Sequence, residues 1–246
     1  MKTLLSILAF LLSPVVFGQA AFFGQNFTPA SSTLPAWVQN GPNGCTSASA
    51  SDTCTFGSNN TAGNSVVLGA FFKFGSSTAC SAFTIRDNAA TSNTYTMVST
   101  VANSSNECLA IYSAKIVNGG GTKLSVTVTG PAGTTQAAIS MAEFSGLGPA
   151  NDASNASNSL QSSANPMVSS AITTRSGDDL VVACFANDAG DITSAISPFT
   201  LMSYQNTGSY SLGCEYNIFS SSQSGLTASM NLSTNSGYYE VIAGIY

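Results

Sequence analysis

Apolar residues gather in short runs that either alternate with polar residues or are continuous, and these runs are rich in Val, Ile, Thr, Phe and Tyr. Gly, Asn, Ser and Pro separate the runs, and helical periodicity is nearly absent. This pattern is typical of β-strands. It predicts strands at residues 35–40, 53–57, 65–74, 79–86, 94–101, 107–117, 123–129, 136–144, 166–174, 179–187, 199–205, 210–219, 226–233 and 238–246. Many short strands between turn residues indicate an all-β fold, an antiparallel β-sandwich of the jelly-roll kind.

One phrase occurs twice along the chain, as GNSVVLGAFFKF at 63–74 and as GDDLVVACFAND at 177–188. Aligning the two glycines places Ala70 opposite Cys184, and later strands align in the same order. The aligned pairs there are Ala110 with Cys214, Tyr112 with Tyr216, and Ala142 with Ala243. We interpret this as a weak internal repeat within one sandwich domain. The alternative is chance similarity between apolar strands.

The repeat divides residues 35–246 into a first half, 35–145, and a second half, 167–246. The connector 146–166 between them is polar and has no periodicity. It is long for a loop in a compact domain, which predicts either a crossing between sheets or a functional loop.

The N-terminus has the pattern of a secretory signal peptide. Lys2 precedes an apolar run from Leu4 to Phe17, and the small residues Gly18 and Ala20 follow on either side of Gln19. The run is shorter than the ~20 residues of a membrane span. We therefore expect a signal peptide at 1–20, a tail at 21–34 and export of the remainder, secreted or held at the cell surface; a retained anchor is the alternative.

Charged residues make up only 7% of the chain, and Ser, Thr, Asn and Gly take their place. Without Lys2 the exported part has 5 basic and 11 acidic residues, a net charge of −6. Such a surface repels phosphate, so the composition argues against nucleic acid as a partner.

Six cysteines lie beyond the signal peptide, an even number that favours three disulfides in an exported protein. Sequence positions predict the pairs Cys45–Cys54, Cys80–Cys108 and Cys184–Cys214. If the last pair bonds, its aligned counterparts Ala70 and Ala110 should face each other in the first half.

Several short motifs resemble those of a group of secreted β-sandwich domains found in soil bacteria such as acidobacteria. They are GNSVVLGAFF, RDNAATSNTYTMV at 86–98, LAIYSAKIV at 109–117, AEFSGL at 142–147 and GDDLVVACFA. The resemblance extends over residues 35–246 and implies the sandwich fold. It carries over no catalytic residues, and the cysteines are a departure from the group.

Candidate chemistry is limited because the chain contains no histidine, which excludes any triad with a histidine base. Glu143, Glu215 and Glu240 lie in predicted strands, and two of them could form the carboxylate pair of a glycosidase. The alternative is that they are solvent-facing or ion-paired glutamates.

Two turns carry acidic and amide side chains. Asn187, Asp188 and Asp191 surround a glycine and could offer oxygen ligands to calcium, whereas the alternative is an ordinary polar turn. Asp87 and Asn93 are expected to brace their own turn through hydrogen bonds from side chain to backbone.

Aromatic rings are a second route to ligand binding, because sugar faces stack on exposed rings. The candidates are Trp37, Tyr204, Tyr210, Tyr216, Tyr238 and Tyr239. Tyr238 and Tyr239 are consecutive, so they must point to opposite faces of their sheet. Burial of the tryptophan in the core is the alternative.

Together these features predict an exported, non-catalytic binding module whose partner is a glycan or another cell-surface polymer. The second hypothesis is a self-associating structural subunit of an extracellular matrix or filament, in which the apolar tail is a donated strand. The third is a carbohydrate-active enzyme that uses the strand glutamates. No cofactor is expected apart from the calcium alternative.

Overall fold

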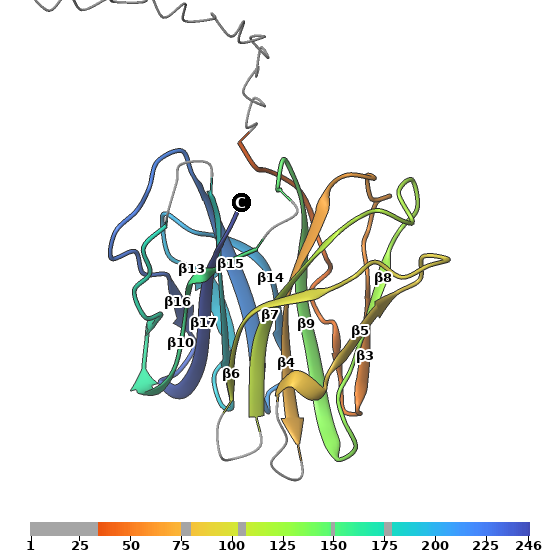
Figure 1. Ribbon diagram of the computed structural model, residues 1–246. Helices are drawn as coiled ribbons and strands as arrows, with labels where there is room; N and C mark the ends of the chain where they lie inside the picture. Colours follow the sequence, from red (N-terminus) through yellow and green to blue (C-terminus); the bar gives the residue numbers. More distant parts are fainter. Residues whose placement is uncertain (1–33, 75–79, 103–106, 149–150, 175–178) are drawn as a thin grey trace, which may run out of the picture. The chain divides into compact units, whose positions relative to one another are not determined.

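A computed structural model describes residues 34–74, 80–102, 107–148, 151–174 and 179–246, with the backbone alone at 81, 151–160 and 162. The expected signal peptide and most of the tail lie outside the described residues. The described chain is all-β, with antiparallel sheets packed against each other as predicted (Figure 1). A 3-10 turn, Cys80–Ala82, accounts for part of the run expected to be a strand at 79–86.

The first half forms a large sheet and a small one. In the first large sheet the strands follow the order β1 (Ala36–Asn40), β9 (Thr134–Ser145), β4 (Ser65–Phe74), β7 (Glu107–Lys115) and β6 (Thr96–Ala102), and β2 (Thr46–Ser47) also pairs with β9. In the first small sheet the order is β3 (Ser51–Thr55), β8 (Ser125–Thr129) and β5 (Thr84–Asp87).

The second half has the same plan. Its large sheet has the order β10 (Asn151–Ala164), β17 (Ser236–Ile245), β12 (Asp179–Asn187), β15 (Ser211–Phe219) and β14 (Thr200–Asn206). Its small sheet has the order β11 (Met167–Val168), β16 (Ser229–Leu232) and β13 (Ile192–Ala195).

The four sheets stack in four layers, with the two large sheets in the middle (Figure 1). Three apolar clusters fill the spaces between the layers. One lies within each half, between its large and small sheets, and we call the third the shared core because both large sheets contribute to it. Both faces of each large sheet are therefore buried, which explains why strands such as β4 and β12 are continuous apolar runs.

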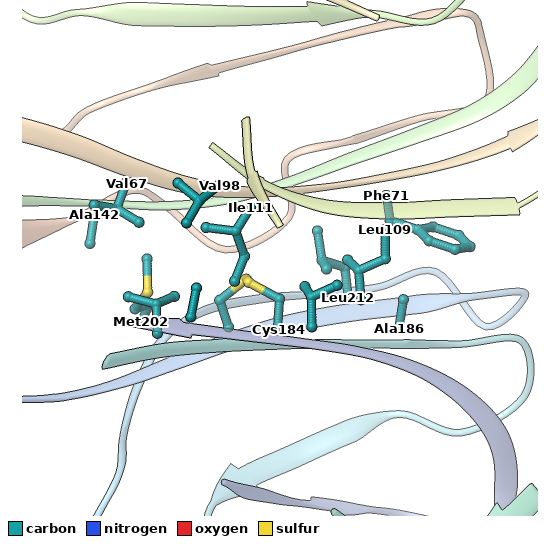
Figure 2. Close-up of a cluster of buried hydrophobic side chains, with 14 of the residues drawn as sticks. Val67, Phe71, Val98, Leu109, Ile111, Ala142, Cys184, Ala186, Met202 and Leu212 are labelled. Atoms are coloured by element: carbon teal, nitrogen blue, oxygen red, sulfur yellow. A yellow bond between two sulfur atoms is a disulfide. The ribbon is translucent and has the colours of Figure 1, made fainter. Parts of the chain in front are cut away.

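Figure 2 shows the shared core, in which side chains of the two halves point toward one another. Val67, Phe71 and Ile111 come from the first half, and Met202 and Leu212 from the second. The disulfide of the second half lies in this layer as well.

The two halves also share an irregularity. The pairing of β6 with β7 shifts between Met97 and Ser99, and the pairing of β14 with β15 shifts between Leu201 and Ser203. The extra residue in each case, Val98 or Met202, is buried in the shared core. Matching strands therefore carry a β-bulge at matching places.

The structure corrects the alignment of two strands. Ala70 packs in the core of the first half, whereas Cys184 packs in the shared core, so they face different layers. Side chains alternate along a strand, and a slip of one residue moves them to the other face. By layer, the counterpart of Cys184 is Gly69, which pairs with Ile111 as Cys184 pairs with Cys214.

All three predicted disulfides are present: Cys45–Cys54, Cys80–Cys108 and Cys184–Cys214. Ala70 and Ala110 do face each other as expected. Three disulfides indicate an oxidising environment outside the cytoplasm. No helix within the described ranges is long and apolar enough to cross a membrane.

The connector does not form a loop. Residues 151–164 form β10, which pairs with β17 at the edge of the second large sheet. Its sequence, NDASNASNSLQSSA, gives no strand signal because it lacks alternating apolar residues. Backbone pairing with β17 defines this strand. The short strands β2 and β13 are likewise absent from the prediction.

Candidate ligand-binding groove

The turn after β5 is held by a network centred on Asp87 and Asn93, as predicted. The Asp87 carboxylate accepts hydrogen bonds from Asn93 Nδ2 at 2.7 Å, from the Tyr95 hydroxyl at 3.1 Å and from the Ala89 amide at 3.2 Å. Burial, followed by the Asp87 charge, raises the pKa of Tyr95, so the phenol stays protonated and donates. The network fixes this turn against the sheet.

Asn93 extends the network to the segment after β7. Its Oδ1 accepts the backbone N–H groups of Val117 and Asn118, both at 2.9 Å, and its Nδ2 donates to the Asn118 carbonyl at 3.0 Å. The buried Asn93 side chain thus joins two surface segments that are distant in sequence.

Two adjoining hollows lie beside this junction. One, of about 270 Å³, is bounded by the turn and by the segment after β7. The other, of about 200 Å³, continues across the ends of β6 and β7 toward the C-terminal strand. We call the pair the upper groove; its polar lining residues include Ser92, Asn93, Thr94, Thr96, Ser113, Lys115 and Asn118.

Lys115 is shared by both hollows and supplies the positive charge of the groove. Its Nζ donates to the Leu147 carbonyl at 2.7 Å. Within the described part of the chain Lys115 forms no ion pair, whereas Lys73 forms two. Hydroxyl and amide groups around an ammonium group suit a ligand rich in hydroxyl groups and in oxygen acceptors.

Of the aromatic candidates, Trp37 is the exposed one, with 47% of its surface accessible. It lies on β1, the outermost strand of the first large sheet, and its indole Nε1 donates to Asn40 Oδ1 at 2.8 Å. Its cross-strand partner Phe144 is fully buried. The alternative, that the lone tryptophan is buried in the core, is therefore wrong.

The tyrosines lie mainly inside the molecule. Tyr210, Tyr238 and Tyr239 are buried, whereas Tyr204 and Tyr216 are half-buried against apolar clusters. Tyr238 and Tyr239 point to opposite faces of β17, as predicted, and both faces are covered. Their hydroxyls bond within the protein, that of Tyr238 to the Val168 carbonyl at 3.0 Å.

The strand glutamates are also buried, and Glu143 has a structural role. Its carboxylate accepts hydrogen bonds from Gln39 Nε2, Asn60 Nδ2, the Thr61 amide and Asn64 Nδ2, at 2.6–2.9 Å. These donors join β1 and the loop before β4 to β9.

Glu240 and Glu215 lie between the two sheets of the second half. Glu240 accepts a hydrogen bond from the Ser170 amide at 2.9 Å. Burial raises the pKa of Glu215 to about 8, and no described group makes a hydrogen bond of good geometry to its carboxyl oxygens. The two residues are two strands and two positions apart, roughly 12 Å between backbones. Neither glutamate lines the upper groove.

The residues considered for calcium have other partners. Asn187 Oδ1 accepts the amides of Ala189 and Gly190 at 3.0 and 2.7 Å, which is the bonding of an Asx turn. Asp188 contacts Lys73, and Asp191 is exposed. Across the described ranges no group of three or more His, Cys, Asp or Glu side chains is placed to hold a metal ion.

Sequence reasoning identified the brace of the groove but not the groove itself. Ser113 and Lys115 come from β7, Thr96 begins β6 and Thr94 lies just before it, and only the pairing of these strands brings the four together. One feature of the sequence pointed to the groove: the segment SNTYT at 92–96, at the end of the turn held by Asp87 and Asn93, is rich in hydroxyl-bearing residues.

Comparison with known proteins finds no family model that matches the chain, and no match among curated proteins or solved structures.

Proposed function

We propose that the protein is an exported, non-catalytic binding module for a glycan or a similar cell-surface polymer, and that the upper groove holds the ligand. The observation that carries this proposal is the lining of the groove: side chains that donate and accept hydrogen bonds surround Lys115, which has no carboxylate partner among the described residues. Sugars offer matching hydroxyl groups, and an acidic sugar would also pair with the ammonium group.

The groove has a rigid frame, which supports the proposal that it is a binding site formed before the ligand arrives. Asn93 and Asp87 hold the two segments on one side, and paired strands form the other. A site that is fixed before the ligand arrives loses less entropy on binding. The signal-peptide pattern of the N-terminal sequence and the disulfides support export to the location where such polymers occur.

The test is a binding screen of the exported chain against neutral and acidic polysaccharides, with calcium or with a chelator. Lys115→Ala should abolish or weaken binding, and Lys123→Ala, which removes an exposed lysine outside the groove, should leave it unchanged. Binding that survives both Lys115→Ala and Thr96→Val would contradict the proposal that the upper groove holds the ligand. Absence of binding to every glycan would contradict the function.

A structural, self-associating subunit is the second candidate, and the outer edge of β1 favours it, because no strand of the described ranges pairs with that edge. Leu34, Trp37 and Val38 are exposed there, next to the apolar segment at 21–33, which lies outside the described residues. Exposed strand edges are sites of pairing between chains. Size-exclusion chromatography with and without the tail, residues 21–34, tests this candidate, because an assembly that requires the tail would disappear on its removal.

We also infer that the two halves arose by internal duplication. The common strand order and the matching bulges at Val98 and Met202 support this inference. A search of related chains for a single half that folds as a pair of identical copies would test it.

A further inference from the structure

Four polar side chains from both halves meet at the end of the shared core that is remote from the upper groove. Lys73 and Glu107 are cross-strand partners on β4 and β7, and Glu107 begins the strand that Lys115 ends. Asp188 follows β12, and Tyr239 lies on β17. Lys73 Nζ lies 3.0 Å from Glu107 Oε1 and 3.3 Å from Asp188 Oδ1, and the Tyr239 hydroxyl donates to Glu107.

The environment gives the two carboxyl groups different tendencies to hold a proton. Burial raises the pKa of Asp188, and the neighbouring Glu107 carboxylate raises it further. Burial alone would raise the pKa of Glu107, but hydrogen bonds from Tyr239, Lys73 and Asp188 bring it below the usual range. Burial would lower the pKa of Lys73, but the two carboxylates outweigh this effect and raise the pKa, so Lys73 is an ammonium group.

We propose that Lys73 and Asp188 condense to an intramolecular amide bond, and that Glu107 carries the protons. A bond forms between Lys73 Nζ and the carboxyl carbon of Asp188, and one carbon–oxygen bond of that carboxyl group breaks. Two of the three ammonium protons leave with the departing oxygen as water, and the third stays on the amide nitrogen. Glu107 takes protons from the nitrogen and returns them to that oxygen, so it ends unchanged.

The geometry supplies what this condensation requires. Well-oriented groups held in contact can react as if at an effective concentration of up to about 10⁵–10⁸ M, which lowers the barrier to forming the bond. Lys73 is fixed by Glu107, and Glu107 itself is 3% exposed and fixed by Tyr239. The Tyr239 ring packs against Phe71 at 6.1 Å and closes the inner side of the cluster.

The bond would also have a mechanical role that the disulfides do not fill. Cys45–Cys54 and Cys80–Cys108 lie within the first half, and Cys184–Cys214 lies within the second. A Lys73–Asp188 amide would join the two halves covalently across the shared core. Such a tie resists separation of the halves under force or heat.

Intact mass spectrometry of the exported protein, reduced and alkylated, tests the proposal. We expect a mass lower than the calculated value by one water molecule, together with a branched peptide that joins Lys73 to Asp188 after digestion. Glu107→Gln retains both reacting groups and removes the proton carrier, so it should show the full mass. Lys73→Arg and Asp188→Ala should show their full calculated masses as well, whereas Lys123→Arg should keep the deficit of one water molecule relative to its own calculated mass.

The intact mass of the parent protein by itself tests whether the amide bond forms, even if one of the variants does not fold. The full calculated mass in natively folded protein, with all six cysteines oxidised before reduction, would overturn the proposal and leave an ion pair only. A missing water located at another residue, or retained in Lys73→Arg, would overturn it equally.

Discussion

Gly69 of the first half lies directly against Cys184 of the second half. A Cβ atom built on Gly69 would stand 2.5 Å from Cys184 Sγ, and closer still to Cys214 Sγ. The backbone of β4 therefore touches a disulfide across the shared core. Only a residue without a side chain leaves room for this contact.

Gly69→Ala should destabilise the protein by about 1–3 kcal/mol, because the added methyl group overlaps a disulfide that cannot rotate away. The free energy of unfolding from urea titration is the measurement. Gly57→Ala is the matched control, because a Cβ there meets nothing within 4 Å. Equal stability of the two variants would contradict the contact.

Removal of the disulfide should relieve this clash. The double change Cys184→Ala and Cys214→Ala should cost about 2–4 kcal/mol by itself. In that background Gly69→Ala should lower the free energy of unfolding by less than it does in the parent protein, because the two sulfur atoms that the added methyl group would overlap are absent. Additive free energies in this cycle would show that Gly69 is constrained by something else.

Glu143→Ala should cost at least about 3 kcal/mol, because it leaves Asn60, Asn64, Gln39 and the Thr61 amide without their common acceptor. Thermal and urea unfolding would measure the loss. Asp191→Ala, which removes an exposed carboxylate, should change the free energy of unfolding by no more than about 0.5 kcal/mol.

Glu215 should make stability fall as the pH rises from about 4.5 to about 8. Its pKa is 4.5 in the unfolded chain and about 8 in the fold, so the folded state holds a proton that the unfolded state has lost in that range. The free energy of unfolding should decrease by roughly 1.4 kcal/mol per pH unit where the slope is steepest.

Asp52 adds a slope of the same sign between its usual value of 3.8 and about 6, because burial raises its pKa too. Glu215→Gln should flatten the dependence above pH 6 and leave only the slope contributed by Asp52 below it. Urea titrations at a series of pH values measure both segments. An unchanged slope in Glu215→Gln would show that Glu215 is ionised in the folded protein.

Asn93→Ala should loosen one wall of the upper groove. It removes the acceptor of two backbone N–H groups, so amide hydrogen exchange at Val117 and Asn118 should speed up by about tenfold or more. Exchange in the strands of the second half serves as the internal reference. Asn59→Ala, an exposed amide, should leave the exchange of Val117 and Asn118 as it was.

The sequence predicted those features that depend on local pattern. The β4 and β12 runs were predicted at their observed bounds, because continuous apolar letters between glycines and turns identify a strand buried on both faces. The disulfides followed from cysteine positions in neighbouring strands. The brace at Asp87 and Asn93 followed from the chemistry of short polar side chains next to turns.

Features that depend on partners distant in sequence were not predictable in the same way. The strand β10 forms because its backbone pairs with the edge of β17, and the residue types at 151–164 do not indicate this pairing. Trp37 is exposed because β1 is the outermost strand of its sheet, where little packs against it. The upper groove required the pairing of β6 with β7 before its hydroxyl groups could be seen as one surface.

The burial of both large sheets on both faces restricts how the sequence of this protein can evolve. A substitution on either face of β4 or β12 meets a packed layer, so these strands are restricted to small adjustments of volume. Turns, strand ends and the two outer sheets meet water, and they can accept new side chains or insertions at little cost to the fold. New binding specificity in such a molecule arises in the turns, at the strand ends and on the outer sheets, while the residues of the two large sheets change little.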